Sequence, residues 1–345
     1  MKNKYKIIPI FIPHLGCSHN CSFCNQKKIT GISKAPTESD ILTIINEYIQ
    51  TFKENELFEI AFYGGSFTAM DINIQKIYLQ AIRDCKDIIK NCIGIRISTR
   101  PDYINESILK LLKEYNVKTI ELGAQSLDDT VLELNKRGHS SNDVYQSSKM
   151  IQQNGFILGI QTMTGLIGDT DEKSVNTAKK VVAIKPDFVR IYPTLTIRDT
   201  YLEEQYNKGL YIPQTLDRAV ELAAKLIQIY NDNNIKIIRV GLCPTKDINE
   251  HADVVAGPFH PAFRQIAESL RIYNILDFKI TNTIKEKPEQ ISIYSNSRNI
   301  SNIVGHKRSN INKLKLKFNI NLINVIEDDS LTDEIKIKCF NKQEK

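Results

Sequence analysis

Residues 5–24 read YKIIPIFIPHLGCSHNCSFC, an apolar, β-rich run followed by three cysteines in C-x3-C-x2-C spacing. The run through residue 13 predicts a strand, so Cys17, Cys21 and Cys24 fall on the loop that follows it. Further along the chain, apolar strand patterns alternate with amphipathic helical patterns. We expect the later strands at residues 58–63, 94–98, 118–123, 156–163, 187–192 and 236–240. Strands separated by helices at this spacing predict right-handed parallel βαβ units.

Six or seven such units predict an α/β fold that forms a partial parallel (β/α) TIM-like barrel. They are too many for a small doubly wound sheet and slightly too few for a closed eight-fold barrel. From about residue 285 the pattern changes, because a charged linker precedes short strand patterns at residues 291–294, 321–326 and 334–340. We therefore expect residues 1–284 to form the barrel core with its extension, and residues 285–345 to form a small basic α+β appendage.

The composition of the 345 residues, 41% hydrophobic and 25% charged, excludes a disordered or collagen-like chain. No apolar run approaches the roughly 20 residues of a membrane span. Seven cysteines do not suit a secreted disulfide framework and favour thiol or metal chemistry in a reducing compartment. The lysine-rich start could resemble an export signal that ends at Cys17, but Pro9 and Pro13 interrupt its apolar stretch. We expect a cytoplasmic protein that does not bind membranes.

The three closely spaced cysteines are the strongest chemical signal in the sequence. Three thiolates can ligate three irons of a cubic cluster and leave the fourth iron open for a small molecule. A zinc knuckle is the main alternative; it needs four ligands, and His14 or His19 could supply the fourth. A second alternative is that the three cysteines lie close together in the sequence by chance. The spacing, together with a position directly after the first strand, favours the iron–sulfur interpretation.

With Phe23 before its last cysteine, this run resembles the signature of radical S-adenosylmethionine (SAM) enzymes. The resemblance implies a 4Fe-4S cluster on Cys17, Cys21 and Cys24, and SAM bound at the open iron. It also implies reductive cleavage of SAM to a 5′-deoxyadenosyl radical, with a small electron donor such as flavodoxin or ferredoxin. The cofactor would supply the difficult chemistry, and the protein would orient the reactants and provide a dry cavity.

Polar residues at the ends of the later strands look like the SAM contacts of that family. A glycine pair follows the second strand, where the absence of side chains lets the backbone approach a ligand. The expected cofactor-binding residues are Gly64, Gly65, Ser66, Ser98, Arg100, Gln125, Gln161 and Arg190. The alternative for each is a polar group that only caps the barrel. No catalytic residue is assigned.

Six motifs are similar to the radical SAM half of elongator complex protein 3, the catalytic subunit that modifies C5 of the wobble uridine in tRNA. They occur in the family's order at residues 98–102, 121–126, 136–139, 165–170, 190–195 and 257–263. Thr164 and Ile167 stand where prolines would be expected. We expect the acetyltransferase domain of full-length members to be lacking. The family's fold and radical initiation are therefore better expectations for this chain than its carboxymethyl product.

The net charge of +6 equals that of residues 298–318, which contain six Lys or Arg and no acid. Within this stretch Gly305 and the residues after it resemble the G-x-x-G loop and following helix of a KH RNA-binding module, with Arg308 in place of the second glycine. The resemblance implies RNA contacts at Gly305, Lys307, Arg308 and Lys313. A basic solvated surface is the alternative, and residues 313–317 also alternate as a strand would.

Three functions therefore remain open. The first is a radical SAM enzyme that modifies tRNA. The second is a radical SAM oxidoreductase acting on a small molecule such as a porphyrin precursor, and the third is a non-catalytic RNA-binding iron–sulfur protein. Cys243 with His251 and His260 is a weaker candidate for an auxiliary metal site. The group transferred, any use of acetyl-CoA, and the oligomeric state do not follow from the sequence.

Overall fold

The computed structural model describes residues 5–32, 34–85, 88–242, 252–284, 288–332 and 334–340. Its contacts divide the chain into two units. The first comprises Met1–Ala219 with Ile229–Pro261, and the second comprises Val220–Gln228 with Ala262–Lys345. The sequence predicted a boundary after residue 284, one helix later than this division. The helix at residues 263–283 groups with the second unit because its apolar side lies in that unit's core.

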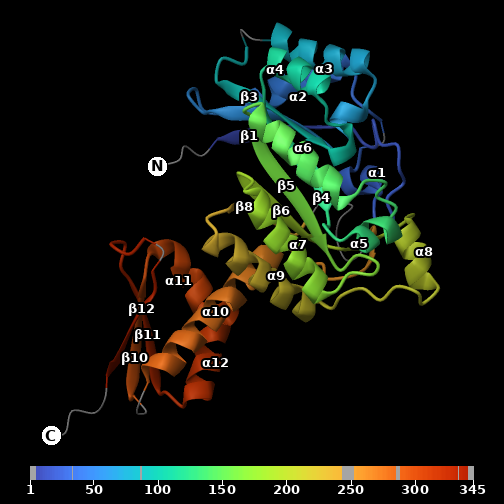
Figure 1. The fold of residues 1–345 in the computed structure, drawn as a ribbon. Helices are drawn as coiled ribbons and strands as arrows, with labels where there is room; N and C mark the ends of the chain where they lie inside the picture. Colours follow the sequence, from blue (N-terminus) through green and yellow to red (C-terminus); the bar gives the residue numbers. More distant parts are fainter. Residues whose placement is uncertain are drawn as a thin grey trace, which may run out of the picture. The chain divides into compact units, whose positions relative to one another are not determined.

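The first unit contains a parallel sheet of seven strands in the order β1-β2-β3-β4-β5-β6-β8. The strands are β1 (Lys6–Phe11), β2 (Phe58–Tyr63), β3 (Cys92–Thr99), β4 (Val117–Gln125), β5 (Ile157–Thr164), β6 (Phe188–Pro193) and β8 (Lys236–Val240). Each strand pairs with the next along the chain, so all the carboxyl ends lie at one edge. The sheet curls into an open barrel (Figure 1), which confirms the predicted fold class.

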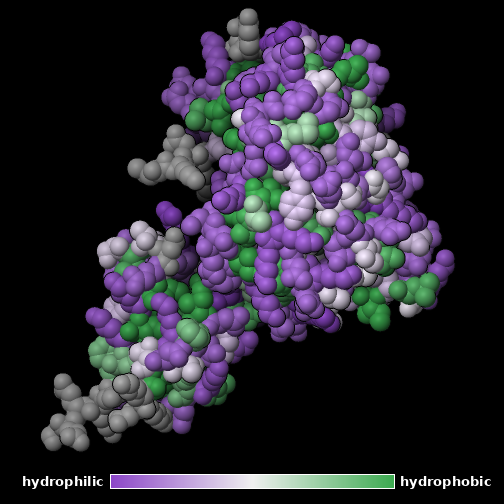
Figure 2. Space-filling model, in the orientation of Figure 1, coloured by the Kyte–Doolittle hydropathy of each residue, from purple (hydrophilic) through white to green (hydrophobic). Residues whose placement is uncertain are grey.

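Helices follow most of these strands, and several of them cover the outside of the sheet (Figure 1). They are α1 (Gln26–Thr30), α2 (Glu38–Gln50), α3 (Ile72–Asp84), α4 (Glu106–Glu114), α5 (Asp129–Leu134), α6 (Ser141–Gln153), α7 (Asp171–Ile184), α8 (Tyr201–Asn207) and α9 (Leu216–Asp232). The outward faces of these helices give the first unit a largely hydrophilic surface (Figure 2). Strands β7 (Thr196–Ile197) and β9 (Val254–Ala256) form a separate antiparallel pair.

Local sequence signals set several helix starts. Before α2, the Thr37 hydroxyl accepts the N–H of Asp40, and the Asp40 carboxylate accepts the N–H of Thr37. Ser140 and Asp143 form the same reciprocal capping box before α6. These caps satisfy backbone donors that the first helical turn leaves without partners. No helix in the described part of the chain is both long and apolar enough to cross a membrane.

The second unit combines a small sheet with three helices. Strand β10 (Gln290–Ser295) lies between β11 (Leu322–Glu327), to which it is parallel, and β12 (Lys336–Phe340), to which it is antiparallel. Helices α10 (Phe263–Thr283), α11 (Ser297–Val304) and α12 (Ser309–Phe318) lie on one side of this sheet (Figure 1). Isoleucine and leucine side chains from helices and strands form its core. This part is α+β as predicted, and residues 313–317 are helical.

Candidate functional site

A cavity of about 560 Å³ opens at the carboxyl ends of the barrel strands. All three cysteines of the C-x3-C-x2-C run line it, and so do all eight residues predicted to bind the cofactor: Gly64, Gly65, Ser66, Ser98, Arg100, Gln125, Gln161 and Arg190. The cavity is in the range of volumes that hold small-molecule ligands. Residues from all seven strands of the sheet and from their loops meet here, because parallel strands present their carboxyl ends on the same side of a barrel.

Backbone contacts hold the cysteine loop against the glycine turn after β2. The N–H of Ser66 donates to the Leu15 carbonyl at 2.9 Å, and the N–H of His14 donates to the Gly64 carbonyl at 2.9 Å. A Cβ at Gly65 would lie 2.5 Å from the carbonyl oxygens of both Ile12 and Leu15. The sequence suggested that these glycines leave room for a ligand. At Gly65 the structure shows a further reason, since only glycine lets the two loops approach.

The three thiols line the same cavity; as whole residues Cys17 is exposed, and Cys21 and Cys24 are half-buried. Burial raises the pKa of Cys24 to about 12, and the neighbouring Cys21 thiol adds to the shift. Burial raises the pKa of Cys17 as well, and the Arg100 and Arg137 charges partly offset this. Within the described ranges, no three His, Cys, Asp or Glu side chains converge on one metal ion, as a zinc knuckle requires. Thiolates that each bind a different iron of a cluster need not converge in this way.

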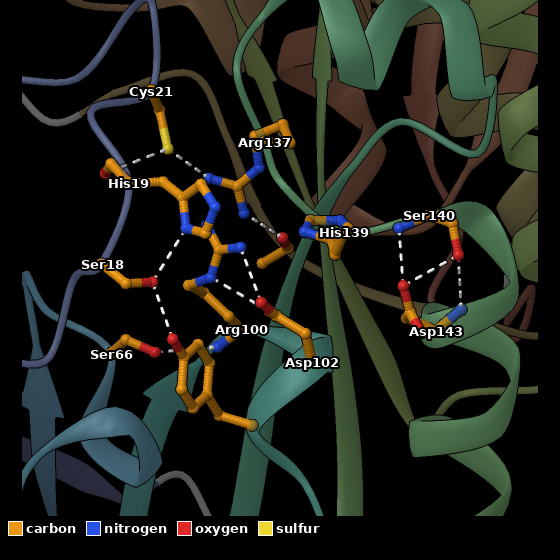
Figure 3. Close-up of polar contacts among 12 residues, drawn as sticks. Ser18, His19, Cys21, Ser66, Arg100, Asp102, Arg137, His139, Ser140 and Asp143 are labelled. Carbon is orange, nitrogen blue, oxygen red and sulfur yellow. Dashed lines mark hydrogen bonds and ion pairs between the residues drawn. The ribbon is translucent and has the colours of Figure 1, made fainter.

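Two side chains donate to the cysteine sulfurs. Gln26 Nε2 donates to Cys24 Sγ at 3.2 Å. Arg137, from the loop after α5, donates from Nη1 to Cys21 Sγ at 2.9 Å and from Nη2 to the Gly123 carbonyl at 2.7 Å (Figure 3). Arg137 is only 5% exposed, and its Nε–H has no hydrogen-bond partner among the residues that the structure describes. The cavity therefore contains three thiols that can ligate iron, the positive charge of Arg137 beside one of them, and one buried N–H without a hydrogen-bond partner in the described residues. These features fit an anionic cluster with a polar ligand.

The ends of β3 and β4 are fixed by hydrogen bonds within the loop after β3, to Ser66 after β2 and to Gln161 of β5. The Arg100 guanidinium donates to the Asp102 carboxylate at 3.0 and 2.8 Å, and the Arg100 N–H donates to Ser66 Oγ at 3.2 Å (Figure 3). Gln161 Nε2 donates to Gln125 Oε1 at 3.3 Å, and Gln125 has a positive φ of 66°. This left-handed backbone is unusual for a residue with a side chain, and it marks the turn out of β4.

Below these residues, a chain of charged side chains crosses the interior of the barrel. Arg96 donates to Glu59 at 2.8 Å and to Glu121 at 2.8 Å. Arg190 donates to Glu121 from Nε at 2.6 Å and from Nη2 at 3.0 Å, and also to the Tyr63 hydroxyl at 3.0 Å. Although Arg190 lines the cavity as predicted, much of its donor capacity is therefore used within the protein. The network forms a rigid, charge-balanced floor under the cavity.

Comparisons with known proteins agree with this geometry. Residues 11–181 match the radical SAM superfamily, and residues 186–272 match the radical SAM C-terminal domain. The chain belongs to the radical SAM superfamily. It is thus a radical SAM enzyme, and the cofactors of this superfamily are a 4Fe-4S cluster and SAM. The spacing of the cysteines had predicted the iron–sulfur cluster, and the resemblance to radical SAM enzymes had implied SAM.

Several known proteins are similar in sequence or structure to this radical SAM enzyme. It is 25% identical over 242 residues to the tRNA uridine(34) acetyltransferase of Dehalococcoides mccartyi, covering 60% of this chain and 52% of that protein. It is 30% identical over 227 residues to an uncharacterized protein of Methanocaldococcus jannaschii, covering 63% and 68%. The solved elongator complex protein 3 of Methanocaldococcus infernus shares the fold with a TM-score of 0.61, 21% identity and coverage of 80% and 63%. The chain spans about half the length of the first of these relatives.

Sequence reasoning missed two contributors to the site of this radical SAM enzyme. Arg137 belongs to the motif at residues 136–139, which pointed to the family but carried no role of its own. Glu121 belongs to the motif at residues 121–126 and organises the two arginines beneath the cavity. A charged residue within an apolar strand pattern was the available signal for Glu121. The candidate auxiliary site cannot be followed, because Cys243 and His251 lie outside the described residues.

Proposed function

We propose that this radical SAM enzyme modifies tRNA, with C5 of the wobble uridine as the first candidate position. The observation that carries the radical chemistry is the single cavity that joins the three cysteines to the polar ends of β2 through β6. The names of the relatives that act on tRNA uridine(34) support the choice of substrate. A cytoplasmic location and reduction by a small donor such as flavodoxin or ferredoxin belong to the same proposal.

In this proposal Cys17, Cys21 and Cys24 hold the 4Fe-4S cluster, and Gly64, Gly65, Ser66 and the polar strand ends hold SAM. When bound and reduced, the cofactor pair supplies a 5′-deoxyadenosyl radical that can take a hydrogen atom from the substrate. The protein's own contribution is electrostatic and steric. Arg137 places a positive charge against the half-buried Cys21, and this charge stabilises an anionic cluster.

The cavity walls also limit access of water. Apolar side chains contribute to the lining, among them Ile7, Pro9 and Phe11 of β1 and Ile29 of α1. Tyr63 donates its hydroxyl to Glu121 at 3.3 Å, and burial raises its pKa, so the phenol stays protonated. A dry wall and a protonated phenol avoid adding unpaired charge beside a reactive radical. Glu121, Arg96 and Arg190 keep this arrangement rigid during the reaction.

The first experiment tests the cofactor part of the proposal. Anaerobic reconstitution of the wild type should give a 4Fe-4S absorbance and, after reduction, 5′-deoxyadenosine from SAM. A variant with Cys17, Cys21 and Cys24 changed to Ala should lose the absorbance and the product while keeping its circular dichroism spectrum. The matched control changes Cys85, a buried cysteine outside the cavity, to Ser. A triple variant that keeps full iron and sulfide would overturn the assignment.

The second experiment tests the substrate. Nucleosides from bulk tRNA of a deletion strain and its parent are compared by mass spectrometry. Loss of one modified uridine in the deletion strain, restored by the wild-type gene and not by the triple cysteine variant, is the expected result. If SAM is cleaved in vitro and the tRNA nucleosides of the two strains are identical, the tRNA proposal fails and a small-molecule substrate becomes the better hypothesis.

A further inference from the structure

The second unit presents a short basic loop between two packed helices. After β10, helix α11 ends at Val304, residues His306–Arg308 form a short turn that is not regular helix, and α12 begins at Ser309. The chain then returns as β11, parallel to β10. Ile303 of α11 and Ile311 and Leu314 of α12 are fully buried in the core. The loop is therefore anchored on both sides, while the side chains of residues 306–308 are exposed. We call residues 305–308 the basic loop.

The path of the basic loop is specified by its residues. Gly305 has a φ of 74°, and a Cβ there would lie 2.9 Å from the backbone nitrogen of Asn310. Lys307 and Arg308 also have positive φ values of 49° and 62°. Asn310, 4% exposed, donates from Nδ2 to the carbonyls of Asn302 and Ser269, both at 2.9 Å. These bonds fix the start of α12 against α11 and α10, so the loop is presented in one conformation.

The charges of the basic segment are not equivalent in the folded unit. Lys317 pairs with Asp277 at 2.6 Å. Arg298 follows Ser297, whose N–H donates to Asp329 at 2.9 Å, so it lies beside acidic residues at the start of α11. Neither Lys307 nor Arg308 has an ion pair with any acid in the described ranges. The basic loop and the acidic end are separated by the length of α11, about 12 Å for eight residues.

We propose that the basic loop binds the phosphate backbone of an RNA strand. An exposed Arg and Lys without acidic partners, on a rigid and glycine-led turn, suit phosphate groups that carry one charge each. Lys313, exposed one turn into α12 and 5.8 Å from the Tyr273 ring, is a further cation that follows the basic loop. The identification of the strand as tRNA rests on the proposed function of the barrel. The family matches end at residue 272, so they assign nothing to the basic loop.

The test measures binding of full-length, reconstituted enzyme to fluorescein-labelled tRNA by anisotropy at 50 to 300 mM KCl. The variant Lys307→Gln/Arg308→Gln removes two charges from the basic loop. The control Arg298→Gln/Lys317→Gln removes two charges from the same segment at positions beside acids. Each phosphate contact contributes about 0.7 to 0.9 to the slope of log K against log salt. The loop variant should therefore lose about 1.4 to 1.8 from this slope, and the control should stay close to wild type.

A third variant, Lys307→Arg/Arg308→Lys, keeps both charges and should keep the wild-type slope. If the loop variant binds as the wild type does, or if the control loses as much as the loop variant, the inference is wrong. Cleavage of SAM without RNA should be the same in all variants. This separates the two proposals, because loop-dependent binding with unchanged tRNA nucleosides in the deletion strain would refute only the proposed substrate of the barrel.

Discussion

The change Glu121→Gln tests whether the charged floor of the barrel stabilises the first unit. Glu121 is 3% exposed and accepts hydrogen bonds from both Arg96 and Arg190. Glutamine keeps the size of the side chain but removes the negative charge, so Glu59 alone is left to balance two buried guanidinium groups. Removing one partner from a buried ion pair costs about 3–5 kcal/mol. For a unit of this size that corresponds to a fall in Tm of about 6–20 °C.

The assay is urea unfolding followed by circular dichroism, with preparations matched for iron content. Glu47→Gln on the exposed surface of α2 is the control and should change the free energy of unfolding by less than about 0.5 kcal/mol. Adding Arg190→Met to Glu121→Gln should recover part of the loss, with a coupling energy of about 0.5–3 kcal/mol. A loss below about 1 kcal/mol for Glu121→Gln, without coupling to Arg190, would refute the reasoning.

Three further predictions concern two residues of the cavity and the buried His139. Arg137→Met removes a donor to Cys21 and should lower the midpoint potential of the cluster, by roughly 60 mV if that bond strengthens by about 1.4 kcal/mol on reduction, as measured by an EPR-monitored redox titration. An unchanged potential would exclude this role. Gly65→Ala should reduce the iron bound per chain, since its Cβ would lie 2.5 Å from two carbonyl oxygens; full iron loading would contradict the contact. Burial lowers the pKa of His139 to about 4, so the folded protein favours the neutral imidazole. Protonation favours the unfolded chain, and the free energy of unfolding therefore decreases as the pH falls from 6.5 toward 4. Between pH 7 and 5 the wild type should lose about 2 kcal/mol more than His139→Gln in urea unfolding, and parallel pH profiles would disprove the assignment.

Local signals in the sequence determined the fold class and the cysteine loop. A strand pattern depends on the alternation and β-branching of residues next to one another, and a helix start depends on pairs such as Thr37 and Asp40, three residues apart. The predicted strands therefore agree with the observed ones to within a few residues. The regular order of strands and helices also determines that the carboxyl ends meet at one edge. For this reason all eight residues predicted to bind the cofactor line one cavity, and their contact with SAM stays a prediction.

The tertiary structure alone decided which distant groups meet and which charges are neutralised. Arg137 and Cys21 are separated by 116 positions in the sequence, and Arg190 and Glu121 by 69. Such contacts depend on the curvature and register of the whole sheet, which no local pattern encodes. The basic segment shows the same limit. Nothing in the sequence distinguishes its six positive charges. In the folded unit, the packing of α12 against α10 brings Lys317 to Asp277, which lies 40 residues earlier, whereas Lys307 and Arg308 stay exposed.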